Sequence, residues 1–197
     1  MHRHKLLDLI APYERQHPDE RRCVERFRQF ITANVACFER SCAGGHVTGS
    51  AWMVNRAGTH TLLTHHRKLQ RWLQLGGHAD GHANILEVAL REAREESGII
   101  ELAPVSPMIF DLDIHRIPAR NGEPEHAHYD VRFAIQTVTT DQYVVSDESH
   151  ALRWVPIEHL SDFTHDVAML RMQRKWYESG FSRAGTPARE NPFLTKR

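Results

Sequence analysis

The sequence predicts an α/β domain that follows a helical N-terminal extension. Three observations lead to this prediction. Apolar residues recur every three or four positions in the first 40 residues, a strand–helix–strand order follows, and apolar and polar residues alternate in two later segments. The chain has 197 residues, a length typical of one domain and sufficient for a hydrophobic core.

Composition excludes several classes of partner. Lys plus Arg and Asp plus Glu both number 25, so the formal net charge is zero. A nucleic-acid polymer or an anionic membrane surface usually requires a basic excess, and we expect neither as partner. The N-terminal segment is a poor signal peptide, because Asp8 interrupts its short apolar stretch. The three cysteines, Cys23, Cys37 and Cys42, fit no disulfide framework. We therefore expect a cytoplasmic protein with reduced thiols.

Two helices are expected in the extension, at residues 4–16 and 19–40. Pro18 suits the start of the second helix, and glycines 44 and 45 interrupt the pattern within residues 41–49. We place the extension at 1–45, the main domain at 46–178 and a tail at 179–197. The tail contains Gly, Pro, Ser and Arg without periodicity, so we expect it to be mobile.

An apolar stripe on the second helix has to be covered. It consists of Phe27, Phe30, Ile31 and Val35, which lie on one side at helical spacing. Either the main domain or a second copy in a homodimer can cover it. We expect packing on the domain and leave a homodimer open.

The main domain is expected to begin with strands at 47–54 and 60–63, joined by a turn at 55–58. A helix follows at 85–97, with Asn84 as its N-cap and Gly98 just beyond its end. Leu86, Leu90 and Ala93, together with residue 97, form the stripe expected to pack on the sheet. Alternating segments at 107–117 and 128–137 predict two more strands joined by a loop at 118–127. A strand at 151–155 and a helix at 165–178 complete the domain.

The helix at 85–97 carries three carboxylates on one face. Glu92, Glu95 and Glu96 stand at i, i+3 and i+4, where like charges repel each other. Arg91 and Arg94 offset part of that repulsion, and a divalent cation would offset more. Because Mg²⁺ prefers oxygen ligands and binds substrate phosphates, these residues predict a metal site.

The glycine-rich loop at residues 76–84 and the helix at 85–97 together resemble the Nudix box, the signature of the Nudix hydrolases. That pattern is Gly, five residues, Glu, seven residues, then Arg-Glu-U-x-Glu-Glu-x-Gly-U, where U is bulky and apolar. Residues 91–99 fit its second half, and Gly77 fits its first glycine. Ala83 stands where the first glutamate belongs, so six of the seven strict positions are kept. The resemblance covers about residues 46–160.

The resemblance implies an α/β/α sandwich with a mixed sheet. It also implies metal-dependent hydrolysis of a diphosphate linkage in a small nucleoside-diphosphate-type substrate, with Mg²⁺ or Mn²⁺ as cofactor. By position, Glu95, Glu96 and the Gly76 carbonyl would hold metal, and Glu92 would be a further ligand or the base. Arg91 would orient the glutamates, and Glu148 would assist. The sequence does not identify the moiety attached to the diphosphate.

Ala83 leaves other functions open. His78, Asp80 or His82 in the same loop could replace the missing carboxylate. Alternatively, the chain binds a nucleotide through this fold without cleaving it. A less favoured alternative is an isopentenyl-diphosphate isomerase, because that chemistry needs a cysteine near the substrate. All three cysteines here precede the first expected strand of the domain.

The two alternating strands form a second group of polar residues. If they pair as an antiparallel hairpin, one face carries Asp111, Asp113, His115, His128, Asp130 and Arg132. An ordinary solvated face is one interpretation. A substrate pocket is the other, in which Arg132 and Arg120 pair with a phosphate or carboxylate beside Asp130, His115 and His128. A softer metal such as Zn²⁺, bound by His115 and His128 with an aspartate, is a third hypothesis.

Overall fold

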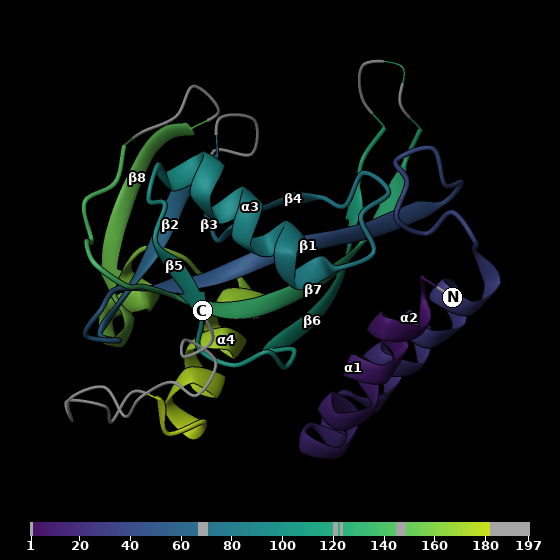
Figure 1. Cartoon of the computed structure of the whole chain (residues 1–197), viewed down its shortest axis with the longest axis horizontal. Coiled ribbons are helices and arrows are strands. Elements are labelled where there is room, and N and C mark those ends of the chain that lie inside the picture. The colour runs from purple at the N-terminus through teal and green to yellow at the C-terminus, as the bar shows by residue number, and fades with distance from the viewer. Residues whose placement is uncertain (1, 67–70, 120–121, 123, 145–148, 182–197) are drawn as a thin grey trace, which may run out of the picture.

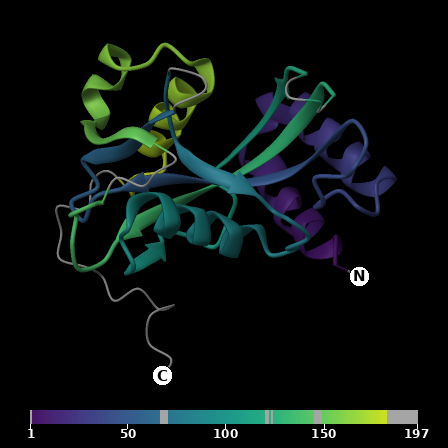
Figure 2. The same cartoon turned by 90° about the horizontal axis from the view of Figure 1, so that it is seen from above.

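A computed structural model describes residues 2–66, 71–119, 122, 124–144 and 149–181 of the chain. Its core is a mixed sheet with one helix on each face (Figures 1 and 2). Helix α3 (Ile85–Ser97) covers one face, and helix α4 (Val167–Glu178) covers the other. The predicted α/β/α sandwich with a helical N-terminal extension is therefore confirmed.

Eight strands form the sheet of the described part of the chain. Their bounds are β1 Gly45–Val54, β2 His60–His66, β3 Arg71–Leu73, β4 Leu75–His78, β5 Leu102–Pro104, β6 Asp111–Ile117, β7 His126–Thr137 and β8 Ser149–Pro156. Strand β1 is central. It pairs in parallel with β7 along its whole length, and antiparallel with β4 in its middle and with β2 at its end. The short strands β3, β4 and β5 were not predicted.

Helix α3 has the predicted bounds, but its ends and packing face differ in part from expectation. Gly98 adopts a left-handed conformation (φ 70°) and its N–H donates to the Arg94 carbonyl, as predicted for a helix end. The Asn84 side chain, in contrast, makes no capping hydrogen bond to the described backbone. The predicted stripe packs against the core, although Leu86 and Leu90 are only partly buried. The buried face comprises Ile85, Val88, Ala89, Ala93 and Ser97.

The extension contains α1 (His4–Gln16), a 3₁₀ turn at Pro18–Glu20 and α2 (Arg21–Ala33). The second helix is shorter than predicted. Asn34 takes an extended conformation, and its side-chain amide donates to the Phe30 carbonyl at 2.8 Å, which stops the helix. Val35 is consequently 67% exposed and does not belong to the apolar stripe.

The rest of the stripe packs on the main domain, as expected. The Phe30 ring stacks on Tyr129 of β7 with centroids 3.8 Å apart, and Phe27 meets the same ring edge-on. Phe27 and Ile31 are fully buried. No second copy is needed to cover these side chains, and the homodimer stays a prediction.

A buried charge cluster joins the extension to the sheet and α4. The Asp111 carboxylate accepts hydrogen bonds from Lys175 at 2.7 Å and from Arg171 at 2.7 and 2.8 Å. The Tyr13 hydroxyl donates to Glu20 and accepts from Lys175 (2.6 Å) and the Leu112 N–H (3.1 Å). Burial opposes ionisation of Asp111, yet the hydrogen bond from Arg171 and the nearby cationic charges hold its pKa below the usual range.

The end of the domain follows the predicted order. Strand β8 pairs with β2, and Asp166 caps α4 by accepting from the Ala168 and Met169 N–H groups. Residues 182–197, most of the predicted tail, lie outside the described residues. The three predicted segment boundaries stay predictions. Each helix that is described is too short or too polar to cross a bilayer.

The Tyr13 hydroxyl offers a direct test of the junction between extension and domain. Tyr13→Phe removes the acceptor of Lys175 and of the Leu112 N–H in a buried setting. We expect the free energy of unfolding to fall by about 1–3 kcal/mol, measured as a lower urea midpoint at unchanged slope. Tyr177→Phe, at a side chain 46% exposed on α4, is the matched control and should change little. Equal midpoints for the Tyr13 variant and wild type would show that the junction contributes no stability.

Candidate active site

The glycine-rich loop meets α3 at Glu92. A Cβ added at Gly77 would lie 2.2 Å from Glu92 Oε2, so only glycine permits this approach. Arg91 Nη2 donates to Glu92 Oε1 at 2.6 Å and to the His78 carbonyl at 2.8 Å. Arg91 therefore holds the Glu92 carboxylate, which is 16% exposed, and ties the helix to the loop. The contact is consistent with the role that the resemblance implied for Arg91, which is to orient the glutamates.

A second contact joins Glu96 to β4, the strand that contains Gly76 and Gly77. The Gly76 N–H donates to Glu96 Oε1 at 2.7 Å. Glu95 lies on the exposed side of the helix. The carboxylates of Glu92 and Glu96 thus reach the backbone of two adjacent glycines in β4, and Glu95 stands beside them on the helix.

The donor set suits a hard divalent cation. It offers carboxylate oxygens from neighbouring turns of one helix, two of which lie against the glycine backbone of β4. The glycine at position 77 leaves a cradle that any Cβ would fill. On chemistry alone, Mg²⁺ or Mn²⁺ fits these residues, and a thiophilic metal does not.

The loop residues considered as replacements for the missing glutamate have other partners. Asp80 forms a bidentate ion pair with Arg40, at 2.5 and 2.8 Å. His82 is exposed and lies 4.0 Å from Glu87. Ala83 is partly buried and packs against the core. The described contacts of Asp80 and His82 therefore give no support to their replacing the glutamate.

Strands β6 and β7 pair antiparallel, as the hairpin considered from the sequence requires. Asp111 lies opposite Arg132, Asp113 opposite Asp130, and His115 opposite His128. Their common face is neither solvated nor an open pocket at its centre, because it packs towards α4. Arg132 is 3% exposed and pairs with Asp111 (3.0 Å), Asp113 (3.3 Å) and Asp130 (2.7 Å).

This pairing changes the expectation for Arg132 and Asp130. A guanidinium enclosed by carboxylates has its pKa raised, although burial opposes the charge, and has little capacity left for a substrate phosphate. Asp130 also accepts hydrogen bonds from Thr48 and Ser50, at 2.9 and 2.8 Å. Their placement indicates a structural role, and the predicted contact with substrate has no support from it.

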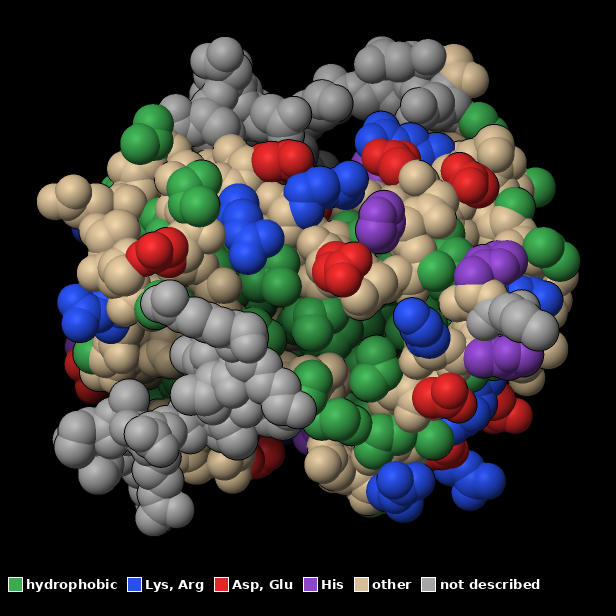
Figure 3. Space-filling view, viewed as in Figure 1, with side chains coloured by type: hydrophobic (Ala, Val, Ile, Leu, Met, Phe, Trp, Pro, Cys, Tyr) green, Lys and Arg blue, Asp and Glu red, His purple; other side chains and the backbone are tan. Residues whose placement is uncertain are grey.

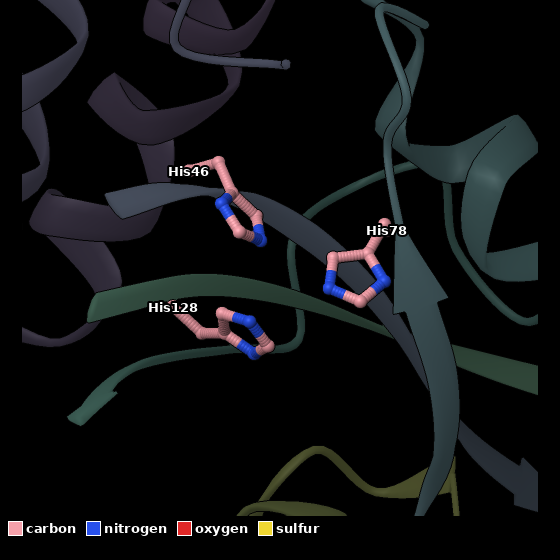
Figure 4. Close-up of side chains that lie close together, drawn as sticks. All are labelled: His46, His78 and His128. Atoms are coloured by element: carbon pink, nitrogen blue, oxygen red, sulfur yellow. The ribbon is translucent and has the colours of Figure 1, made fainter. Parts of the chain in front are cut away.

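Histidines occupy the other end of the same face. The ring of His128 lies 4.8 Å from that of His46, 5.1 Å from His78 and 5.3 Å from both His115 and His126, measured between centroids. Burial, and then the neighbouring imidazoles, lower the pKa of His46 to about 4 and that of His128 to about 2. His115 instead pairs with Asp113 at 3.1 Å. Figure 4 shows His46, His78 and His128 converging from three strands.

The prediction of the first strand explains why His46 was missed. That strand was expected from residue 47, whereas β1 begins at Gly45. The alternation of His46, Thr48 and Ser50 with apolar or small neighbours was the available signal.

Two predicted site residues lie outside the described part of the chain, namely Glu148 and Arg120. One pocket of about 400 Å³ is formed between α1, the segment 106–110 and α4. It contains none of the α3 glutamates, so it says nothing of the predicted chemistry. On the face that Figure 3 shows, acidic and basic side chains are interspersed.

Comparisons with known proteins identify the family. A family model described as the NUDIX domain matches residues 45–176. No curated protein matches the chain by sequence. Similar solved structures include an Ap4A hydrolase of C. elegans (18% identity, TM-score 0.55, covering 68% of this chain and 96% of that one). They also include the Nudix hydrolase RenU of M. smegmatis (18% identity, TM-score 0.54, covering 76% of this chain and 94% of that one). A third is a MutT protein of Methanosarcina mazei Go1 (18% identity, TM-score 0.55, covering 69% of this chain and 95% of that one).

At these identities the structures show a shared fold, and the family model carries the assignment. The chain therefore belongs to the NUDIX domain family, and its predicted enzyme class, a Nudix-type pyrophosphohydrolase, is confirmed at that level.

Proposed function

We propose that this protein hydrolyses the diphosphate linkage of a small nucleoside-diphosphate-type substrate, with Mg²⁺ or Mn²⁺ bound at the α3 glutamates. The single observation that carries the proposal is the contact of Glu92 and Glu96 with the adjacent glycines of β4. It gathers hard oxygen donors at one point, where a cation and a diphosphate can meet. A cytoplasmic location stays a prediction.

The residues take distinct roles in this proposal. Glu95, Glu96 and the Gly76 carbonyl hold the cation, which when bound neutralises phosphate charge and favours ionisation of a water molecule. Glu92 is either a further ligand or the base that accepts a proton from the attacking water. Arg91 positions Glu92 through the 2.6 Å contact and keeps the loop against the helix through the His78 carbonyl. Glu148 stays in the set from the resemblance alone.

Binding without cleavage is the second candidate function. Ala83 favours it, because the box lacks one of its glutamates and the methyl group packs against the core. The three remaining glutamates favour hydrolysis. A panel of diphosphates, assayed with Mg²⁺ and Mn²⁺, separates the two functions. It should include dinucleoside polyphosphates, since one similar structure is that of an Ap4A hydrolase.

Glu96→Gln tests the proposed metal ligand. The amide oxygen can still accept from the Gly76 N–H, so the fold should persist while the negative charge is lost. We expect turnover of the best panel substrate to fall roughly 100-fold or more, and the Mg²⁺-induced rise in melting temperature to disappear.

Glu87→Gln is the matched control, because Glu87 is an exposed glutamate on the same helix. It should retain activity and the response to Mg²⁺. If Glu96→Gln keeps both as well, Glu96 does not bind the metal. If wild-type protein cleaves no panel member but is stabilised by a nucleotide, the binding function replaces hydrolysis.

Ala83→Glu tests the departure from the box. The substitution restores the seventh strict position in a loop that already has Gly77 and Gly81. We expect several-fold faster hydrolysis at limiting Mg²⁺, because an added carboxylate strengthens cation binding. His82→Ala, which alters an exposed neighbour, should leave the rate unchanged. An unaltered Mg²⁺ dependence in Ala83→Glu would mean that Glu92, Glu95 and Glu96 suffice. Activity lost in His82→Ala would show that the histidine has taken over the role.

A further inference from the structure

Three histidines from three strands face one another at the end of the sheet. His46 belongs to β1, His78 to β4 and His128 to β7, and we call them the histidine cluster. One ligand nitrogen from each lies within 4.8 Å of the other two. The backbone pairing that brings them together is direct for His46 and His128, which are register partners. In Figure 4 the rings turn towards a common point.

The cluster contains buried nitrogens that need a ligand. His46 is 3% exposed, and neither of its ring nitrogens has a hydrogen-bond partner among the described residues. The same holds for Nε2 of His128. A buried polar atom without a partner is costly, so such atoms in a native fold call for an explanation, for example an ion.

We infer that His46, His78 and His128 bind one transition-metal ion of the Zn²⁺ type. Imidazole nitrogens suit Zn²⁺, Ni²⁺ and Cu²⁺ and are poor ligands for Mg²⁺. With Zn–N bonds of about 2.0–2.1 Å, nitrogens around a tetrahedral ion lie about 3.4 Å apart. The ligand nitrogens now lie within 4.8 Å of one another, so binding would draw them closer together. Three protein ligands leave a fourth position for water or an anion.

This metal site is separate from the proposed hydrolytic site. A Cβ added at Gly49 would touch Ile85 and Val88, so that side of β1 faces α3. His46, Thr48 and Ser50 alternate with Gly49 and therefore point to the opposite side. The two sets differ in donor chemistry as well, nitrogen on one face and oxygen on the other, so they select different ions.

The electrostatics of the cluster favour a cation over an anion. A histidine binds an anion most strongly when its ring is protonated, whereas a metal ligand requires a neutral ring nitrogen. His46 is buried, and the ring centroids of His78, His126 and His128 lie 4.8–5.1 Å from its own, a setting that disfavours several protonated rings. Among the other nearby groups, His126 and Arg40 lower the pKa of His46, and Asp80 raises it.

An ion in this position would also fix the start of the glycine-rich loop. His78 is the last residue of β4, and its carbonyl accepts from Arg91, which in turn holds Glu92. We therefore expect the ion to stabilise the fold and to restrain the loop, without contact with the diphosphate.

Zinc titration of the full-length protein, after EDTA treatment, tests the site. Isothermal calorimetry should give a stoichiometry of one Zn²⁺ per chain, and excess Mg²⁺ should not change it. Zinc should also raise the melting temperature of the protein. His128→Ala and the half-buried His78→Ala should each weaken zinc binding more than about 100-fold. His159→Ala, at an exposed histidine, and Glu96→Gln should bind zinc as wild type does.

X-ray absorption of the zinc-loaded wild-type protein keeps the test independent of how the variants fold. The spectrum should show a nitrogen shell with the outer scattering of imidazole rings. An oxygen shell without imidazole scattering would overturn the inference, as would zinc binding that survives both His78→Ala and His128→Ala or is lost in Glu96→Gln. If zinc has no effect but inorganic phosphate stabilises the protein at neutral pH, the cluster is an anion site instead.

Discussion

The parallel pairing of β1 with β7 is the constraint on which the rest of the structure depends. The two strands stay in register from Gly45 opposite Ala127 to Val54 opposite Gln136. Because side chains alternate along a strand, this single register assigns every residue of the pair to one of two faces. Small and apolar side chains, such as those of Val47 and Val131, face α3 and the extension. The opposite face receives the histidines, Asp130 and Arg132.

Each face then satisfies its polar groups in a different way. On the α4 side, Arg132, Arg171 and Lys175 neutralise buried aspartates, and Tyr13 brings the extension into the same network. Removal of one member would leave a buried charge without its partner, which is more costly than loss of a surface ion pair. On the α3 side, glycines admit the carboxylates of Glu92 and Glu96 against the backbone of β4. The buried ion pairs and the carboxylates that we propose to be catalytic thus lie on opposite sides of one sheet.

Local patterns were predictable from the sequence, and their partners were not. The bounds of the 85–97 helix followed from its periodicity, and the alternation within β6 and within β7 predicted which of their residues share a face. The early end of α2 depended on the Asn34 side chain, and the pairing of β1 with β7 joins residues about 80 positions apart, for which no local signal exists. For the same reason Arg132 was expected to bind substrate, since the sequence did not reveal that Asp111, Asp113 and Asp130 would enclose it. The histidine cluster combines residues from three strands that are far apart in the sequence, so no local pattern predicted it.

In our proposals, the sheet separates an oxygen-donor metal site on the α3 face from a nitrogen-donor site on the α4 face. Anomalous diffraction from crystals grown with both Mn²⁺ and Zn²⁺, measured at each metal's absorption edge, tests it most directly. We expect a manganese peak beside Glu92, Glu95 and Glu96. We expect a zinc peak among His46, His78 and His128. Both metals in one shared site, or no manganese at the α3 glutamates, would contradict it.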